Sequence, residues 1–294
     1  MGRKTKDSGI DGLLVVDKPA GWTSHDVVAK ARGAYGQRRA GHSGTLDPDA
    51  TGVLLLGFGQ VTRLLPHLTA LRKTYTCELV LGATTSTLDD SGVVTETFEM
   101  AGTTLSQVTA ATAKFIGDIH QIPPMVSAVQ VGGVRLHELA RQGIEIERAP
   151  RPVTVYRYDV THEIEPGIFA ATVECGSGTY VRTLAADLGA ALGGGAHLRN
   201  LRRTNVGSFD ATTGITPGDP TFGTSTLLSP AEAMRDYEAV TLTEDELTEI
   251  RHGRAIATEL TAEVIRLLRS SGELVAVGAA NEGRLRPITV IAER

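Results

Sequence analysis

The stretch GHSGTLDPDATG, residues 41–52, decides how this sequence is interpreted. Glycines and a proline restrict its backbone around one carboxylate, Asp47, and apolar residues follow neither the helical nor the strand period. The residues alone leave two interpretations open. Asp-Pro commonly starts a turn, or a rigid loop presents Asp47 as a nucleophile or base. The whole segment 33–52 is predicted to be a long loop, and loops of that length usually carry a function.

The flanking residues predict strands and helices without regular alternation. Apolar and β-branched runs predict strands, of which residues 73–81 alternate most clearly, with Tyr75, Cys77, Leu79 and Leu81 on one face. Thr23 or Ser24 is expected to cap a helix containing Val27, Val28 and Ala31. The other expected strands are 13–16, 53–56, 93–98, 152–164 and 168–175, and the other expected helices end near residue 115 and follow Gly176 to Thr179.

This pattern predicts an α+β fold with a mainly antiparallel mixed sheet. Between residues 217 and 230 the composition shifts to Pro, Gly, Ser and Thr, which is typical of a domain boundary. The remaining 58 or so residues can form only a small module, and short apolar runs within it predict that it is rich in strands. We therefore expect a domain at residues 1–236 and a second one at 237–294.

Charge is distributed unevenly along the chain. The total is −5, but residues 1–75 hold eleven Lys and Arg against six Asp and no Glu, a net charge of +5, which leaves −10 for the rest. A second basic group lies at Arg199, Arg202 and Arg203. Such segregation allows a basic groove for nucleic acid on an acidic body, although an ordinary solvated surface explains it equally well.

Composition argues against several other classes of protein. The chain contains two cysteines, Cys77 and Cys175, far apart in apolar segments, which predicts buried thiols rather than a disulfide or a metal pair. The eight histidines lack the spacing of a metal site, so we expect no metal. No apolar run reaches the roughly 20 residues of a membrane span, and residues 1–12 lack the features of a signal peptide. We expect a cytoplasmic protein.

Six ordered motifs resemble the TruB family of pseudouridine synthases. Residues 41–52 resemble its aspartate motif. The others, in the order of the family, are KPAGWTS (18–24), RKTY (72–75) with Leu81-Gly82 and residues 85–92, QIPP (121–124) with Ser127-Ala128, GTYVR (178–182), and His197-Leu198 with LRRT (201–204). Together they span about 190 residues. The C-terminal block resembles a short PUA domain, a small RNA-binding β-barrel, more loosely.

The resemblance implies a pseudouridine synthase domain with a thumb-like insertion at about 120–147, followed by a PUA-like domain. It implies isomerisation of the uridine at position 55 in the T-loop of transfer RNA, without cofactor or metal. We expect the protein to act as a monomer. The glycosidic bond from C1′ to N1 must break and a bond from C1′ to C5 must form. A carboxylate can attack C1′ or C6, or take part in proton transfer at the ribose, and the sequence does not select among these routes.

The resemblance also implies roles for particular residues. Asp47 is the catalytic aspartate, Arg182 pairs with it, and Tyr75, Tyr180 and Leu201 hold the uracil after the base leaves its stack. His42 is expected to enter the RNA loop in place of the flipped base. Lys18, Arg202 and Arg203 are assigned to phosphate, with a solvated charge as an equally good interpretation of each. From the residues alone, Tyr75 and Leu201 would pass as ordinary core.

The sequence departs from the common family residues at two places, and two alternative functions stay open. Gln130 and Leu136-His137 differ from the common family residues within the thumb-like segment, which can weaken or redirect RNA contacts. The principal alternative is an RNA-binding chaperone that remodels transfer RNA, with incidental synthase activity. Another is a synthase that depends on a guide RNA, as in the archaeal and eukaryotic relatives, but this chain has no long basic tails.

Overall fold

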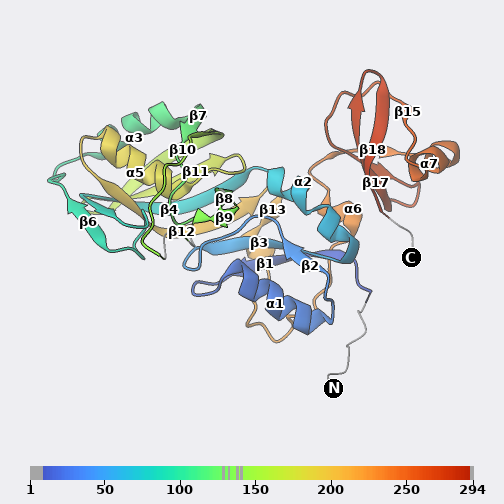
Figure 1. The fold of residues 1–294 in the computed structure, drawn as a ribbon, viewed down its shortest axis with the longest axis horizontal. Coiled ribbons are helices and arrows are strands. Elements are labelled where there is room, and N and C mark those ends of the chain that lie inside the picture. Colours follow the sequence, from blue (N-terminus) through green and yellow to red (C-terminus); the bar gives the residue numbers. More distant parts are fainter. Residues whose placement is uncertain (1–8, 128–129, 132, 137–138, 140–141, 292–294) are drawn as a thin grey trace.

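The computed structural model describes residues 9–127, 130–131, 133–136, 139 and 142–291. Two β-sheets dominate it, a nine-stranded sheet and a smaller five-stranded sheet at the C-terminal end (Figure 1). The large sheet has the order β1-β3-β12-β4-β11-β10-β7, with β2 paired to β3 and β13 paired to β12. All of its pairings are antiparallel except the short one between β3 and β12. The predicted α+β class with a mainly antiparallel mixed sheet is confirmed.

The elements of the first part of the chain are β1 (Gly12–Lys18), α1 (Ser24–Tyr35), β2 (Ala40–His42), β3 (Thr51–Phe58), α2 (Leu65–Ala70), β4 (Lys73–Leu81), β5 (Ala83–Thr85), β6 (Val94–Thr97), α3 (Leu105–Thr112), β7 (Gly117–Gln121), β8 (Gln130–Val131), β9 (Val134–Arg135), β10 (Arg151–Glu165), β11 (Ile168–Cys175), α5 (Val181–Ala191), β12 (Ala196–Val206) and β13 (Phe209–Asp210). Short 3-10 helices occupy Gly59–Arg63, Ala113–Phe115 and Ala211–Thr213. His137, which with Leu136 makes up the second departure in the thumb-like segment, lies outside the described residues.

The later elements are α6 (Pro230–Ala233), β14 (Glu238–Thr241), α7 (Glu244–Arg251), β15 (Ile256–Ala257), β16 (Ile265–Leu268), β17 (Leu274–Asn281) and β18 (Arg284–Val290). Strands β14 to β18 form the smaller sheet, a β-rich, PUA-like module. It also contains α7, which the sequence analysis did not predict. An apolar cluster joins this module to the large sheet, because Leu274 and Val277 pack in the same cluster as Leu13, Val61 and Met234.

Alternation along the strands produces separate cores on the two faces of the large sheet. Leu14 and Val16 of β1 face α1, whereas Leu13 and Val15 face the cluster shared with the C-terminal module. At the other end of the sheet α3 and α5 cover a third core, which includes Tyr75, Cys77, Leu79 and Leu81 of β4 (Figure 1). Both cysteines are buried and free, as predicted.

The prediction of a continuous loop at 33–52 is wrong at both ends. Helix α1 runs to Tyr35 and ends at Gly36, whose φ of 60° lies in the left-handed region that glycine tolerates. Residues 40–42 then pair with β3, and β3 itself begins at Thr51. The irregular segment that remains, residues 43–50, is the part that carries Asp47.

Candidate active site

The loop that carries Asp47 is held in place by side chains from three other segments. Ser24, at the start of α1, accepts from the Leu46 amide at 2.9 Å and donates to the Leu46 carbonyl at 3.2 Å. The Lys18 ammonium donates to the Pro48 carbonyl at 2.8 Å, and an Arg203 Nη2 donates to the Gly44 carbonyl at 3.2 Å. Main-chain groups that the irregular loop leaves unpaired are thereby satisfied, and the backbone on both sides of Asp47 is fixed.

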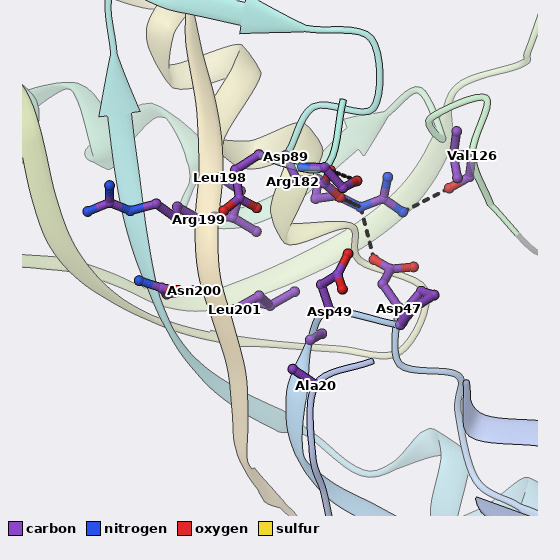
Figure 2. A pocket seen from close by; sticks show the side chains of 14 residues that line it. Ala20, Asp47, Asp49, Asp89, Val126, Arg182, Leu198, Arg199, Asn200 and Leu201 are labelled. Carbon is purple, nitrogen blue, oxygen red and sulfur yellow. Dashed lines mark hydrogen bonds and ion pairs between the residues drawn. The ribbon is translucent and has the colours of Figure 1, made fainter. Parts of the chain in front are cut away.

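Asp47 pairs with Arg182 across the centre of the site (Figure 2). Arg182 Nε lies 3.0 Å from Asp47 Oδ2 and 3.5 Å from Asp89 Oδ2, so one guanidinium lies against two carboxylates. Its other nitrogens each donate at 2.8 Å, Nη1 to the Thr87 carbonyl and Nη2 to the Val126 carbonyl. The Arg182 side chain is only 3% exposed. Its orientation is therefore determined by contacts on every side.

The surroundings of Asp47 oppose its ionisation on balance. Loss of hydration is the largest effect and raises the pKa of Asp47, the Arg182 charge lowers it, and the nearby Asp89 charge raises it again. The net direction is upward from the ordinary aspartate value. Even so, 39% of the side chain remains accessible to solvent. Asp47 is thus a carboxylate that a ligand can reach, in surroundings that make its charge state sensitive to its neighbours.

Five residues predicted for the active site line one pocket of about 230 Å³. They are Asp47, Tyr75, Tyr180, Arg182 and Leu201, which come from four segments of the chain. A second cavity of about 440 Å³ shares Asp47, Arg182 and Leu201 with it and extends toward Ala20 and Asn200 (Figure 2). The structure therefore gathers an aspartate, its arginine partner, two tyrosines and a leucine around one space.

The two tyrosines are held in different ways. Tyr75 is 9% exposed, and burial raises the pKa of its hydroxyl, which is hydrogen-bonded to Arg203. Tyr180 is held through its main chain, because the buried Gln121 side chain accepts from the Tyr180 amide at 2.8 Å and donates to its carbonyl at 3.1 Å. Burial raises the pKa of Tyr180 as well, and the neighbouring Ser127 side chain and Arg182 charge offset part of that effect.

Lys18 and Arg203 do not lie where phosphate-binding residues would. Lys18 is completely buried and donates to the carbonyls of Pro19, Trp22 and Pro48 at 2.7 to 2.9 Å. Burial is also the main reason why the pKa of Lys18 is lowered to about 8. Arg203 is 1% exposed and donates to the Val53 carbonyl at 2.7 Å. The phosphate role predicted for these two residues is not supported, because their nitrogens hold the backbone around the site.

Arg202 and His42 lie at more accessible positions. The Arg202 side chain is 38% exposed and forms a two-point ion pair with Asp17 at 2.8 and 2.9 Å. His42 is half-buried, and its ring packs edge-on against His25, with centroids 5.5 Å apart. Burial is the largest of the effects that lower the pKa of His42 to about 4, with the charges of His25 and Arg203 adding to it. The imidazole is therefore neutral near pH 7.

Asp89, Ser24 and Gln121 were not identified individually as site residues. All three fall within the motifs that resemble the family, but nothing in the residues themselves distinguishes them. From the sequence, Asp89 is predicted to begin a turn at residues 89–92, whereas in the structure its carboxylate faces Arg182. Among the described residues, no group of three or more His, Cys, Asp and Glu is arranged to hold a metal ion. Within the same part of the chain, no helix is both long and apolar enough to span a membrane.

Comparison with known proteins identifies the family of the chain. Three family models match the chain: "TruB family pseudouridylate synthase (N terminal domain)" at residues 32–181, "tRNA pseudouridylate synthase B C-terminal domain" at 182–218, and "tRNA Pseudouridine synthase II, C terminal" at 237–292. Relatives named tRNA pseudouridine synthase B include one from Arthrobacter sp. (strain FB24), 42% identical over 96% of this chain and 97% of the relative. Another, from Paenarthrobacter aurescens (strain TC1), is 43% identical over 96% of both.

Solved structures support the same assignment. The chain is 27% identical to one in a Cbf5-Nop10-Gar1 complex, with a TM-score of 0.71 over 96% of this chain and 84% of that one. A chain from an H/ACA RNP bound to a substrate RNA containing 2′-deoxyuridine shares the fold, with a TM-score of 0.70 at 24% identity over 96% of this chain and 86% of that one. On the matches in sequence and structure together, the chain belongs to the TruB family of pseudouridylate synthases.

Proposed function

We propose that this protein isomerises the uridine at position 55 in the T-loop of transfer RNA to pseudouridine, with Asp47 as the nucleophile. The observation that carries the proposal is the single pocket lined by Asp47, Arg182, Tyr75, Tyr180 and Leu201. The names of its relatives, tRNA pseudouridine synthase B, support the reaction and the class of RNA. The accessible Asp47 carboxylate, paired with a buried guanidinium, supports the role of nucleophile.

The reaction requires the base to be released, turned and joined again. The bond from C1′ to N1 breaks, N1 gains a proton, a bond from C1′ to C5 forms and C5 loses its proton. Arg182 keeps Asp47 oriented and favours its ionised form. Tyr75, Tyr180 and Leu201 enclose the uracil while it turns, which prevents its escape. Neither redox chemistry nor an added group is needed for this exchange of bonds.

The target base must leave the folded T-loop to reach this pocket. We assign to His42 the position that the base vacates, since its ring is neutral and only half-buried near the Asp47 loop. Arg202 remains a candidate for contact with RNA phosphate, because more than a third of its side chain is exposed beside Asp17. Lys18 and Arg203 act instead by holding the loop.

The proposal extends to the organisation of the protein. We assign residues 1–236 to the catalytic domain, with the thumb-like insertion at about 120–147, and residues 237–294 to a PUA-like RNA-binding domain. The separate sheet of strands β14 to β18 and the family model at 237–292 support this division. The protein is proposed to act as a monomer, without a cofactor or a metal ion, on transfer RNA in the cytoplasm.

Release of tritium from transfer RNA labelled at uridine C5 tests this function. The purified protein is incubated with the transcript and a chelator, without guide RNA, and a transcript with cytidine at position 55 serves as the control. We expect release from the first transcript and none above background from the second. Equal release from both would refute the assignment to position 55. No release, with RNA still bound, would favour the chaperone or the guide-dependent alternative.

A further inference from the structure

Strand β12 contains a bulge beside the active-site pocket. Its register on β4 pairs Arg199 with Glu78 and Arg202 with Thr76, so β12 uses one more residue than β4 over this interval. Asn200 within the bulge has a φ of 53°, in the left-handed region that glycine adopts readily and other residues adopt at a cost. Asparagine is among the residues that tolerate this region best.

The bulge decides which side chain reaches the 230 Å³ pocket, because Leu201 lines it and Arg199 and Asn200 do not. Without the extra residue, strict alternation from the buried Leu198 would direct Asn200 toward the pocket and Leu201 away from it. Figure 2 shows the opposite arrangement, with Arg199 and Asn200 pointing to one side and Leu201 pointing toward the side of Asp47. Leu201 accordingly lines both cavities that meet at Asp47 and Arg182, whereas Arg199 and Asn200 line only the larger one.

Glu78 on β4 holds Arg199 and Asn200, the two residues of the bulge that do not line the 230 Å³ pocket. Its Oε2 accepts from Arg199 Nε at 2.6 Å, and its Oε1 accepts from Asn200 Nδ2 at 2.8 Å. The Glu78 side chain is 20% exposed and that of Arg199 is 31% exposed, so the cluster is partly shielded from water. Burial opposes the charge of Glu78, but these hydrogen bonds outweigh it and hold the pKa of Glu78 below its usual value.

We propose that Glu78 is a positioning residue for the uridine pocket, which stabilises the Arg199–Leu201 bulge and thereby directs Leu201 against the base. Glu78 does not line either cavity and acts only through β12. The inference rests on the proposed function, because Leu201 is taken to contact the uracil. The charged contact of Glu78 with Arg199 and its neutral contact with Asn200 would then determine the position of Leu201, although Glu78 itself does not line the pocket.

The test compares single-turnover tritium release by Glu78→Ala, Glu78→Gln and Asn200→Gly with the double variant Glu78→Ala/Asn200→Gly. A matched control is Glu174→Ala, which removes another strand glutamate of the same sheet that pairs with an arginine, Arg72, at 3.4 Å. Binding of T-arm RNA and thermal unfolding are measured in parallel. Methyl resonances of Leu201 in leucine-labelled protein report the position of that side chain without any need for activity.

We expect Glu78→Ala to slow single turnover by about tenfold, because a displaced pocket residue misplaces the base, while the Kd for RNA stays within about twofold. Glu78→Gln keeps an acceptor for Asn200 and should lose less. Glycine at position 200 adopts the left-handed backbone without the hydrogen bond to Glu78. The double variant should therefore recover most of the rate and the Leu201 methyl shifts of the parent. Glu174→Ala should match the parent.

Two results would overturn the inference. One is a Glu78→Ala protein that unfolds at a lower temperature but turns over at the parental rate with unchanged Leu201 shifts, because Glu78 would then be purely structural. The other is a double variant no faster than Glu78→Ala. A parent protein that releases no tritium would instead refute the proposed function, and the methyl shifts would still decide whether Glu78 positions Leu201.

Discussion

Replacing Arg182 with lysine separates the charge of this residue from its geometry. The guanidinium uses three nitrogens in three directions, toward Asp47, the Thr87 carbonyl and the Val126 carbonyl. A lysine has one nitrogen on a flexible stem and cannot reproduce this fork. If the ammonium stays with Asp47, the two carbonyls lose their partners, and each unpaired buried acceptor costs about 1–3 kcal/mol.

The combined cost is therefore about 2–6 kcal/mol. If this whole cost raises the barrier of the chemical step, even its lower limit of about 2 kcal/mol slows the reaction roughly 30-fold, since about 1.4 kcal/mol corresponds to a factor of ten. The assay is single-turnover tritium release with saturating enzyme, beside a measurement of RNA binding. Arg157→Lys, which alters an exposed ion pair with Asp159 on β10, is the control and should stay within about twofold, since such pairs contribute little. A rate for Arg182→Lys within threefold of the parent would refute the reasoning.

The proximity of Asp89 to Asp47 predicts how the reaction rate depends on pH. The ionised form of Asp47 is the reactive one, so the rate rises as pH passes through its raised pKa. The Asp89 charge contributes to raising that pKa. Asp89→Asn should therefore shift the acidic limb of the pH–rate profile to lower pH, whether or not the plateau rate falls. An acidic limb that stays in place or moves to higher pH would contradict the assigned electrostatics.

Three further predictions concern residues around the pocket. Burial, His25 and Arg203 hold the pKa of His42 at about 4. The NMR resonances of His42 should therefore not titrate between pH 5.5 and 8, and His25→Ala should raise the pKa of His42. A His42 transition near pH 6.5 in the parent would contradict this. Lys18→Gln should leave the salt dependence of RNA affinity unchanged, whereas loss of a phosphate contact would reduce the log–log slope by about 1. Tyr75→Phe keeps the ring and should retain far more single-turnover activity than Tyr75→Leu, so equal rates for the two variants would exclude a role for the aromatic face.

Regular alternation made part of the fold predictable. Strand β4 occupies residues 73–81 as expected, because Tyr75, Cys77, Leu79 and Leu81 follow the strand period without interruption. Strand β12 was not predicted, although it lies between β3 and β4 in the large sheet. Its pairing with β4 shifts register twice, and each extra residue breaks the period on which strand prediction depends. The bulge between Arg199 and Arg202, which makes β12 hard to predict from its sequence, also orients Leu201.

The site was predictable to a different extent. From its own residues, Asp47 cannot be distinguished from the start of a turn, and only the similarity of the ordered motifs identified it. The phosphate role predicted for Lys18 and Arg203 followed from the usual surface position of charged side chains, and the burial of both residues does not support it. An irregular loop leaves carbonyl groups without partners, and these two cations satisfy them from within. That need arises from the tertiary structure and is not visible in local sequence.

The most direct test of the central claim compares Asp47→Asn with the parent in a single-turnover reaction on transfer RNA labelled at uridine C5. The substitution keeps the size of the side chain and removes its charge, and Ser24, Lys18 and Arg203 still hold the loop. We predict unchanged folding, RNA affinity within a few-fold of the parent, and no tritium release above background. Appreciable turnover by Asp47→Asn, with its sequence verified by mass spectrometry, would contradict the assignment of Asp47 as the nucleophile.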